Sequence, residues 1–288
     1  MMSRNDENKN EIGTLYICPT PIGNLDDITM RTLSTLREAD LIMAEDTRHT
    51  VRLLNHFDIK KPLTSYHEHN KFSKEEYIID KLMSGENIAL VSDAGMPGIS
   101  DPGEEIIKAC IENGIEVIGL PGASASVLAL VVSGLPTGKF AFEGFLSSKK
   151  SERRRELGEL KSEKRTIIFY ESPHRLLKTL KDMEEILGNR KIALSRELTK
   201  RYEEINRGKI SEIIEEYSKR DIKGEIVIVM EGADESSETE NSEEEEISIE
   251  EELRKMIDSG MTKKDAVKKL SKDKNIPKNE VYKCSLNL

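Results

Sequence analysis

The residues from 92 to 103 read Ser92-Asp93-Ala94-Gly95-Met96-Pro97-Gly98-Ile99-Ser100-Asp101-Pro102-Gly103. This stretch follows a short apolar run, Asn87–Val91, and precedes an amphipathic pattern, Glu104–Asn113, so it predicts a loop between a strand and a helix. Glycine lets the backbone approach a ligand closely, and proline stiffens the loop that carries it. Because ligands of open α/β sheets bind beyond the carboxyl ends of the strands, we expect a binding site here.

Two further loops of this kind lie on either side of it in the sequence. Pro19–Leu25 follows the strand-like segment Gly13–Cys18, and Pro121–Ser126 follows the strand-like segment Ile115–Leu120. Neither contains G-x-x-x-x-G-K-[ST] or G-x-G-x-x-G, so the phosphate-binding loops of nucleotide-binding proteins are not indicated. One loop of this composition can be an ordinary turn. Three of them in one half of the chain favour a shared ligand site, since a protein builds few such sites.

Strand-like and helix-like segments alternate from residue 12 to residue 135, which predicts an α/β domain with a mostly parallel sheet. We expect its strands at Gly13–Cys18, Leu41–Ala44, Asn87–Val91 and Ile115–Leu120. Its helices are expected at Ile28–Glu38, Thr47–Asn55, Ser73–Met83, Glu104–Asn113 and Ser124–Val132. The turn-forming residues Gly134–Gly138 mark its end.

A second domain, of mixed α/β structure with some antiparallel pairing, is expected over residues 139–232. Its strands are predicted at Phe140–Leu146, Thr166–Tyr170, Lys191–Arg196 and Glu225–Glu231, with Tyr202–Ile210 as a candidate fifth strand. Its helices are predicted at Lys149–Leu160, Pro173–Leu187 and Ser211–Lys219. Pro173 suits the first turn of its helix, because an N–H group at that position has no partner within the helix.

The C-terminal part has a different composition. Residues 233–246 are rich in Ser and Glu and almost without apolar side chains, which predicts an acidic, flexible linker. Residues 247–288 predict a small helical module with helices at Ile249–Ser259, Lys263–Ser271 and Lys278–Leu286. Within it, Gly260–Val267 resembles the start of a helix-turn-helix unit.

The net charge of −10 is unevenly distributed along the chain. Residues 232–253 contain eleven Asp or Glu and no Lys or Arg, and the rest of the chain has a balance of +1. Two segments are basic: residues 149–155, and residues 254–288, with ten Lys or Arg against four Asp or Glu. Such clusters are typical of phosphate-binding surfaces, although a solvated helix face has the same composition.

The sequence lacks the patterns that would indicate a disulfide-rich, zinc-binding, secreted or membrane-spanning protein. Cys18, Cys110 and Cys284 show no C-x-x-C spacing, so neither a disulfide framework nor a zinc site is indicated. Residues 1–11 have no apolar core of the kind found in secretory signals, and the longest apolar run, Val127–Val132, is far too short to cross a bilayer. We therefore expect a cytoplasmic protein without membrane contact.

Six segments, taken in order, resemble the small-subunit ribosomal RNA methyltransferases I, a family within the tetrapyrrole methylase superfamily. They are Thr20–Leu25, Ala44–Arg48, Asp93–Gly103, Pro121–Ala125, Phe169–Arg175 and Arg196–Lys200. The resemblance covers about residues 12–232 and, more loosely, the basic tail. Met96 departs from it, since the family usually has threonine there, and this puts a side-chain hydroxyl contact in doubt.

The resemblance implies a two-domain tetrapyrrole-methylase-like fold of α/β class. It also implies 2′-O-methylation of a cytidine in the decoding region of 16S ribosomal RNA, with S-adenosyl-L-methionine as cofactor. The partner would be the RNA or the assembled 30S subunit, and the chain would form a homodimer. Methyl transfer asks the protein mainly to position two reactants, which agrees with loops rich in backbone contacts and poor in titratable groups.

Asp93 is the leading cofactor residue, because it ends a strand and its carboxylate can meet an ammonium group or ribose hydroxyls; a plain turn cap is the alternative. By resemblance, Ile22, Met96, Ser124 and Ala125 line the cofactor pocket, and the second domain closes it with Phe169, Tyr170, Ser195 and Glu225.

A base near the ribose would help to remove the proton of its 2′-hydroxyl. Asp46 and Glu171 are the leading candidates, and the neighbouring Glu45, His67, Glu68 and His69 remain alternatives. Asp46 could instead cap a helix. RNA contacts are expected from Arg48, His67, His69, Lys149, Lys150, Arg153, Arg154, His174 and Arg175. No metal is expected, because His67 and His69 have no third ligand nearby in the sequence.

Two other functions stay open at this point. A methylase acting on a tetrapyrrole would share the fold and the cofactor, but it would not need the basic segments. A non-catalytic RNA-binding or assembly protein would have no cofactor pocket, which the three Gly/Pro-rich loops argue against.

Overall fold

The structure is a computed structural model that describes residues 12–67, 71–101, 103–234, 249–273 and 277–286. The chain divides into two compact units. The larger runs to Glu231 and omits residues 162–164; the smaller holds those three residues and the chain from Gly232 onward. Within the described residues, no helix is long and apolar enough to cross a membrane.

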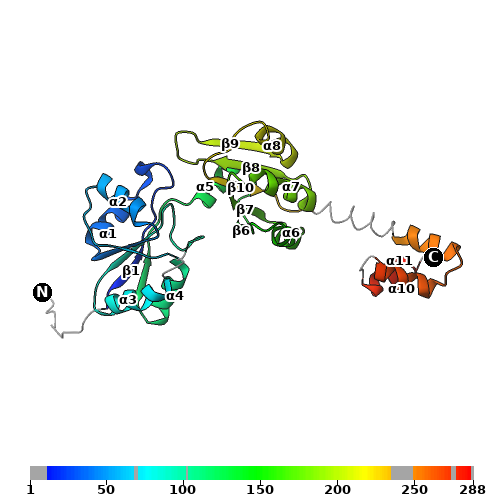
Figure 1. Cartoon of the computed structure of the whole chain (residues 1–288), viewed down its shortest axis with the longest axis horizontal. Helices are drawn as coiled ribbons and strands as arrows, with labels where there is room; N and C mark the ends of the chain where they lie inside the picture. Colours follow the sequence, from blue (N-terminus) through cyan, green and yellow to red (C-terminus); the bar gives the residue numbers. More distant parts are fainter. Residues whose placement is uncertain (1–11, 68–70, 102, 235–248, 274–276, 287–288) are drawn as a thin grey trace. The chain divides into compact units, whose positions relative to one another are not determined.

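The first half of the larger unit forms the expected parallel sheet (Figure 1). Its strands are β1 (Thr14–Ile17), β2 (Leu41–Ala44), β3 (Leu63–Ser65), β4 (Ile88–Val91) and β5 (Glu116–Gly119), in the order β3-β2-β4-β1-β5. All four pairings are parallel. Every residue of β2 and β4 is buried, as in a sheet covered on both faces.

Two pairs of helices provide that cover. One face packs on α1 (Met30–Glu38) and α2 (Thr47–His56), through Leu33, Leu36 and Leu54. The other face packs on α3 (Lys71–Met83) and α4 (Gly103–Glu112), through Ile78, Leu82 and Ile106. A short 3-10 helix, η1 (Leu25–Asp27), precedes α1. The carboxyl ends of β1, β4 and β5 therefore carry the three Gly/Pro-rich loops at one edge of the sheet.

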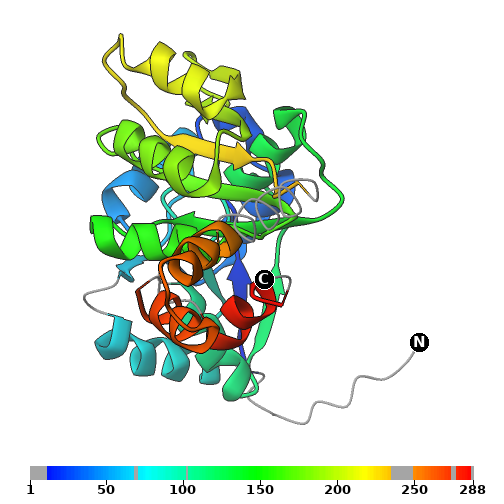
Figure 2. The same cartoon turned by 90° about the vertical axis from the view of Figure 1, so that its right-hand side faces the viewer.

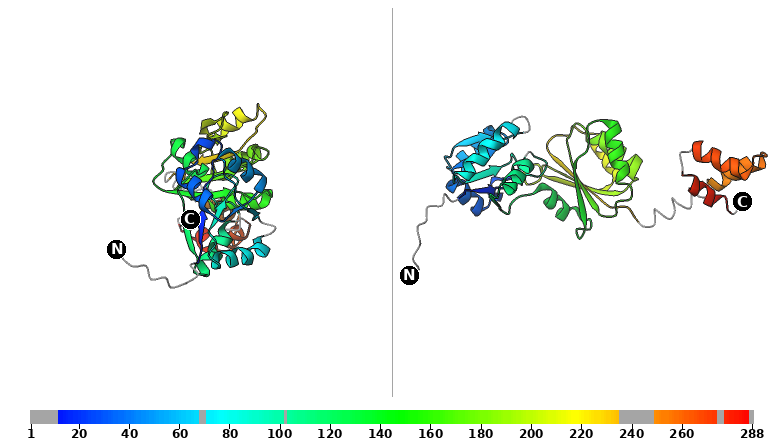
Figure 3. Two further views of the ribbon diagram at one scale, coloured as in Figure 1. Left: turned by 90° about the vertical axis from the view of Figure 1, so that its left-hand side faces the viewer. Right: turned by 90° about the horizontal axis from the view of Figure 1, so that it is seen from below.

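The second half forms a mixed sheet, which can be followed by its green-to-yellow colours in Figures 2 and 3. It contains β6 (Phe140–Phe145), β7 (Thr166–Glu171), β8 (Lys191–Arg196), β9 (Glu204–Lys209) and β10 (Ile226–Met230), ordered β6-β7-β10-β8-β9. Only β6 and β7 pair in parallel. The antiparallel pairing expected here is present, and the candidate fifth strand forms β9.

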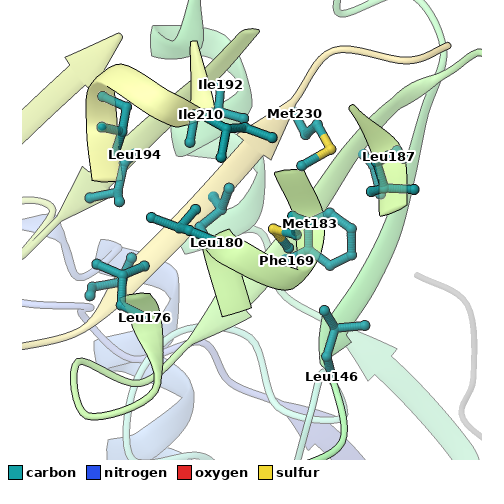
Figure 4. Packing of buried hydrophobic residues seen from close by; sticks show 14 of the residues in the cluster. Leu146, Phe169, Leu176, Leu180, Met183, Leu187, Ile192, Leu194, Ile210 and Met230 are labelled. Atoms are coloured by element: carbon teal, nitrogen blue, oxygen red, sulfur yellow. The ribbon is translucent and has the colours of Figure 1, made fainter. Parts of the chain in front are cut away.

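One face of this sheet carries a large apolar cluster (Figure 4). It packs on α6 (Lys150–Glu159), α7 (Leu176–Leu187) and α8 (Ile210–Tyr217). The opposite face packs on α5 (Ala125–Ser133), through Ala129 and Leu130. Since α5 follows the last strand of the first sheet but packs on the second, it ties the two halves together.

The start of α7 differs from the prediction. Pro173 does not open the helix; residues 173–175 form a turn, and α7 begins at Leu176. The carboxylate of Glu171 accepts hydrogen bonds from the N–H group of Ser172 and from the side chain of Arg175, which holds the chain in that turn.

The smaller unit has its own apolar core. Residues 249–258 are helical, and they are followed by α10 (Lys263–Asp273) and α11 (Lys278–Cys284). Leu253, Val267, Leu270 and Val281 are buried among these helices. The predicted linker lies outside the described residues apart from Ala233 and Asp234. The proposed boundaries at residues 135, 139 and 232 stay predictions.

Candidate active site

A cavity of about 420 Å³ lies between the loop edge of the first sheet and the second sheet, within the larger unit. The loops after β1, β4 and β5 line one side, and residues of β7, β8 and β10 line the other. Eight of the nine expected cofactor residues are among its walls. They are Ile22, Asp93, Met96, Ser124, Ala125, Tyr170, Ser195 and Glu225.

Hydrogen bonds hold the loop after β4 in place at this cavity. Its backbone exchanges two hydrogen bonds with the loop after β1, between Thr20 and Gly95, at 2.9 and 3.0 Å. Gly95 and Gly98 have φ of +81° and +84°, a region that favours glycine. The Asp101 carboxylate accepts the N–H groups of Gly98 and Gly103, at 2.7 and 2.8 Å. Glycine and aspartate are therefore needed to shape this wall.

Asp93 follows β4 directly, and its carboxylate has a fixed orientation. One oxygen accepts the backbone N–H of Asp46 at 3.1 Å. The other lies 3.6 Å from Nδ1 of His49. The side chain keeps 35 % of its surface exposed, so it remains accessible to a ligand.

Ser195 offers an unusual polar group to the cavity. It lies on β8, opposite Val227 of β10, and is fully buried. Among the described residues its hydroxyl has no hydrogen-bond partner. A buried hydroxyl without a partner costs about 1–3 kcal/mol, and a polar atom of a bound ligand would remove that cost.

Phe169 is the one expected cofactor residue whose side chain does not line the cavity. Successive side chains of a strand point to opposite faces of the sheet, and Phe169 packs under α7 in the apolar cluster of Figure 4. Its neighbour Tyr170 points to the cavity face, with its ring 5.0 Å from Phe142 and 5.5 Å from Phe145. Tyr170 is thus the aromatic residue that β7 contributes.

Both leading candidates for the base, Asp46 and Glu171, form hydrogen bonds with neighbouring residues. The buried Glu171 accepts hydrogen bonds from the Ser172 N–H, the Arg175 guanidinium and the Thr179 hydroxyl, so its oxygens are fully engaged. Asp46 caps α2 and pairs with Arg48, whose hydrogen bonds hold the pKa of the carboxyl well below its ordinary value. A carboxylate with so low a pKa is a weak proton acceptor. Both carboxylates therefore take part in local structure, and their role as a base stays a prediction.

Glu45, one of the open alternatives, lies in the cavity wall. Burial raises the pKa of its carboxyl, and the nearby Asp93, Asp101 and Asp46 raise it further. Its neighbour in sequence, Asp46, is thus perturbed in the opposite direction. The raised pKa moves Glu45 toward the range in which a base works near neutral pH.

Three residues expected to contact RNA form ion pairs within the chain. Arg153, only 4 % exposed, donates two hydrogen bonds to Asp182, at 2.6 and 2.9 Å. Arg154 bridges Asp182 and Glu185. Arg175 binds Glu171 and, at 2.9 Å, the carbonyl oxygen of Leu146. These guanidinium groups hold α6, α7 and β7 together. Ion pairs within the protein therefore explain part of the basic character of residues 149–155 without an RNA partner.

The remaining candidates have mixed positions. Lys150 and His174 are exposed, and Lys149 is exposed and paired with Glu152. Arg48 is exposed but closed onto Asp46, and His67 is half-buried. His69 and Glu68 lie outside the described residues.

Leu198 lines the cavity but was not singled out from the sequence. Its neighbours Glu197 and Thr199 both have positive φ, at 54° and 65°. A side chain at Gly23 would collide with Thr199 and Lys200, so the loop after β1 packs closely on this turn. Arg196–Lys200 was recognised as a motif, but only the folded chain shows that it closes the cavity.

Comparison with known proteins places the chain in a family. Residues 14–214 match the family Tetrapyrrole (Corrin/Porphyrin) Methylases. Proteins named ribosomal RNA small subunit methyltransferase I are 50 % identical to the chain, over 96 % of it and 96 % of the relative from Halalkalibacterium halodurans, and over 95 % and 94 % for the one from Bacillus subtilis.

Solved structures agree in fold. A cobalt precorrin-4 methyltransferase matches with a TM-score of 0.60 at 16 % identity, covering 79 % of this chain and 98 % of that one. Uroporphyrin-III C-methyl transferase from Thermus thermophilus, solved with S-adenosyl homocysteine, matches with a TM-score of 0.55 at 17 % identity, covering 76 % and 97 %. The chain belongs to the tetrapyrrole methylases and, among them, to the ribosomal RNA small subunit methyltransferase I family.

Proposed function

We propose that this chain transfers the methyl group of S-adenosyl-L-methionine to the 2′-hydroxyl of a cytidine in the decoding region of 16S ribosomal RNA. The observation that carries the proposal is the cavity of about 420 Å³, which gathers the three Gly/Pro-rich loops and the buried, unpartnered hydroxyl of Ser195 in one place. The names of the relatives at 50 % identity supply the substrate class.

The residues present suit this cofactor. Ile22, Met96 and Leu198 provide apolar surface, and Ser195 provides a buried hydroxyl for a heterocyclic or ribose atom. The Ser124 side chain does not cap α5, so the first N–H groups of that helix remain available to a carboxylate. Asp93 can pair with an ammonium group. When bound, the cofactor supplies an activated methyl group on a sulfonium sulfur.

The protein's own contribution is to orient and to exclude water. The hydrogen bonds between Thr20 and Gly95, and those to Asp101, fix the wall before any ligand arrives. Holding two reactants in the correct geometry is worth several kcal/mol of a transfer barrier. A rigid wall therefore fits a reaction in which positioning is the main demand.

The RNA-binding surface that we propose is the C-terminal module. On α10 the apolar residues Ala266, Val267 and Leu270 are buried, and five lysines are exposed. They are Lys263, Lys264, Lys268, Lys269 and Lys272. A lysine-rich helix face of this kind neutralises phosphates. On the larger unit, exposed Lys150 and His174 are separate proposed RNA contacts, and a homodimer remains part of the proposal.

The test is methyl transfer from labelled S-adenosyl-L-methionine to three substrates: unmethylated 30S subunits, free 16S RNA and uroporphyrinogen III. We expect label in the ribosomal RNA, mapped by mass spectrometry to one cytidine ribose. Label in the tetrapyrrole alone would favour the biosynthetic methylases with which the chain shares its fold. Binding of the cofactor without transfer to any RNA would contradict the proposal.

A further inference from the structure

A second cavity, of about 220 Å³, adjoins the first. It is lined by the loop after β1, by the first half of α2, and by Ser92 and Asp93. Ser92 and Asp93 also line the larger cavity. The start of the loop after β4 is therefore the shared wall of two adjoining spaces.

Arg52 gives this second cavity a cationic group. It lies on the exposed side of α2, three residues after His49, so the two side chains share one face of the helix. In the described part of the chain, no hydrogen bond or ion pair engages the Arg52 guanidinium. Arg48, one turn earlier on α2, is by contrast paired with Asp46. Arg52 is thus free to bind an anion, and a guanidinium matches the oxygens of a phosphate well.

His49 also lines the second cavity, and it contacts the shared wall. Its Nδ1 is 3.6 Å from the Asp93 carboxylate, whose other oxygen is fixed by the N–H of Asp46. A carboxylate on this side favours the tautomer with the proton on Nδ1, which leaves Nε2 as a proton acceptor. A histidine oriented by an aspartate is the arrangement that many enzymes use to deprotonate a hydroxyl.

We infer that the second cavity receives the acceptor nucleotide of the RNA, with His49 as the base for its 2′-hydroxyl and Arg52 as the ligand of an adjacent phosphate. This inference rests on the proposed function. The O–H bond breaks and its proton passes to Nε2 of His49, while the oxygen forms a bond to the methyl carbon. The C–S bond breaks, and its electron pair stays on sulfur. The positive charge lost at sulfur appears on the imidazolium, beside Asp93.

Glu45 is the rival base within the same walls. Its pKa is raised, but it lines only the larger cavity and has three carboxylates around it. His49 instead lines the second cavity, which shares Asp93 with the larger one. A comparison of His49→Gln with Glu45→Gln distinguishes the two assignments.

The experiment uses the full-length chain and unmethylated 30S subunits. His49→Gln is expected to lower kcat by about 10²- to 10⁴-fold, the usual contribution of a general base. His56→Gln, on the last turn of α2 and outside both cavities, is the matched control and is expected to stay within about twofold of wild type. Calorimetry with S-adenosylhomocysteine should give similar affinities for both variants.

The Arg52→Gln variant is tested by its affinity for 30S subunits as well as by its activity. Without cofactor, the affinity for 30S subunits should fall about tenfold, and the slope of log K against log salt should decrease by about one, as for one lost phosphate contact. Arg31→Gln, an exposed arginine on α1 outside both cavities, is the control. The loss in activity should lie mainly in KM.

Three results would overturn the inference. His49→Gln and Arg52→Gln could both match wild type, or Glu45→Gln could lose kcat while His49→Gln keeps it. In either case an active wild-type enzyme leaves the proposed function standing. Wild-type protein that methylates neither 30S subunits nor 16S RNA would refute the proposed function and this inference with it.

Discussion

Two segments of this chain stand out in the sequence for opposite reasons, and the structure treats them differently. The loop at residues 92–103 is rich in Gly, Pro and Asp, and its residues 92–96 and 99–101 line a cavity. The segment at residues 149–155 is rich in Lys and Arg, yet Arg153 binds the buried Asp182, and Arg154 pairs with Asp182 and with the exposed Glu185 of the same chain. A Gly/Pro-rich loop after a strand indicates where in the fold it lies. A run of basic residues does not indicate whether acidic side chains or phosphates neutralise it.

The substitution with the largest expected effect is Arg153→Ala, which tests whether this arginine stabilises the fold rather than binding RNA. It leaves Asp182 buried, with only the single contact to Arg154, and removal of one partner from a buried pair typically costs about 3–5 kcal/mol. We expect the free energy of unfolding, measured in urea, to fall by an amount of this order. Lys150→Ala, on the exposed side of the same helix, should change it by less than about 0.5 kcal/mol.

A loss of RNA affinity in Arg153→Ala with unchanged stability would indicate that this arginine contacts RNA. Affinity should therefore be measured on the same preparations, at a temperature where both variants are folded.

The complementary change in the other segment is Asp93→Ala. We expect the affinity for S-adenosylhomocysteine to fall by about 100-fold or more, since a charged partner of the ligand is lost, which corresponds to about 2.8 kcal/mol. The half-exposed carboxylate contributes little to packing, so the urea midpoint should stay near that of wild type. Calorimetric titration gives the affinity, and an unchanged value would remove Asp93 from the cofactor site.

The three Gly/Pro-rich loops could be expected to lie together because the ends of parallel strands fix their positions. The loops at residues 19–25, 92–103 and 121–126 follow parallel strands, and parallel strands bring their carboxyl ends to one edge. Sequence reasoning could not choose between Phe169 and Tyr170, because Thr166–Glu171 is buried on both faces and shows no alternation that tells core from cavity. It also missed β3, since Leu63–Ser65 is a short, half-buried edge strand without an apolar run.

Ion pairs across the fold were beyond the same reasoning. Arg153 and Asp182 are 29 residues apart, and each alone looks like part of a solvated helix face. His49 and Arg52 lie within the predicted helix Thr47–Asn55, and nothing in their spacing indicates a cavity. Such residues become recognisable only when the neighbouring elements are in place.

Residues 247–288 contain the second basic segment of the chain. Their removal tests whether a basic segment with exposed lysines binds RNA. Removal of residues 247–288 takes away a surplus of basic residues, including the five exposed lysines of α10. We expect binding to 30S subunits to weaken by about tenfold at low salt, with less weakening at high salt, because released counterions supply most of this affinity. Affinity for S-adenosylhomocysteine should change by less than twofold. Equal loss of both affinities, or of neither, would count against the tail as an RNA-binding module.

The substitution with the smallest expected effect is Ser195→Ala. It is informative because stability should rise while the affinity for the cofactor product should fall. Ser195→Ala removes a fully buried hydroxyl that has no partner among the described residues, so the free chain should gain about 1 kcal/mol of stability. If a polar atom of the cofactor normally meets this hydroxyl, the affinity for S-adenosylhomocysteine should fall several-fold in the same variant. Thermal unfolding with and without the ligand measures both effects: Tm should rise in the free chain, and the shift produced by ligand should shrink. A Tm that falls in the free chain would mean that the hydroxyl already has a partner there, and Ser195 would then be a structural residue like Arg153.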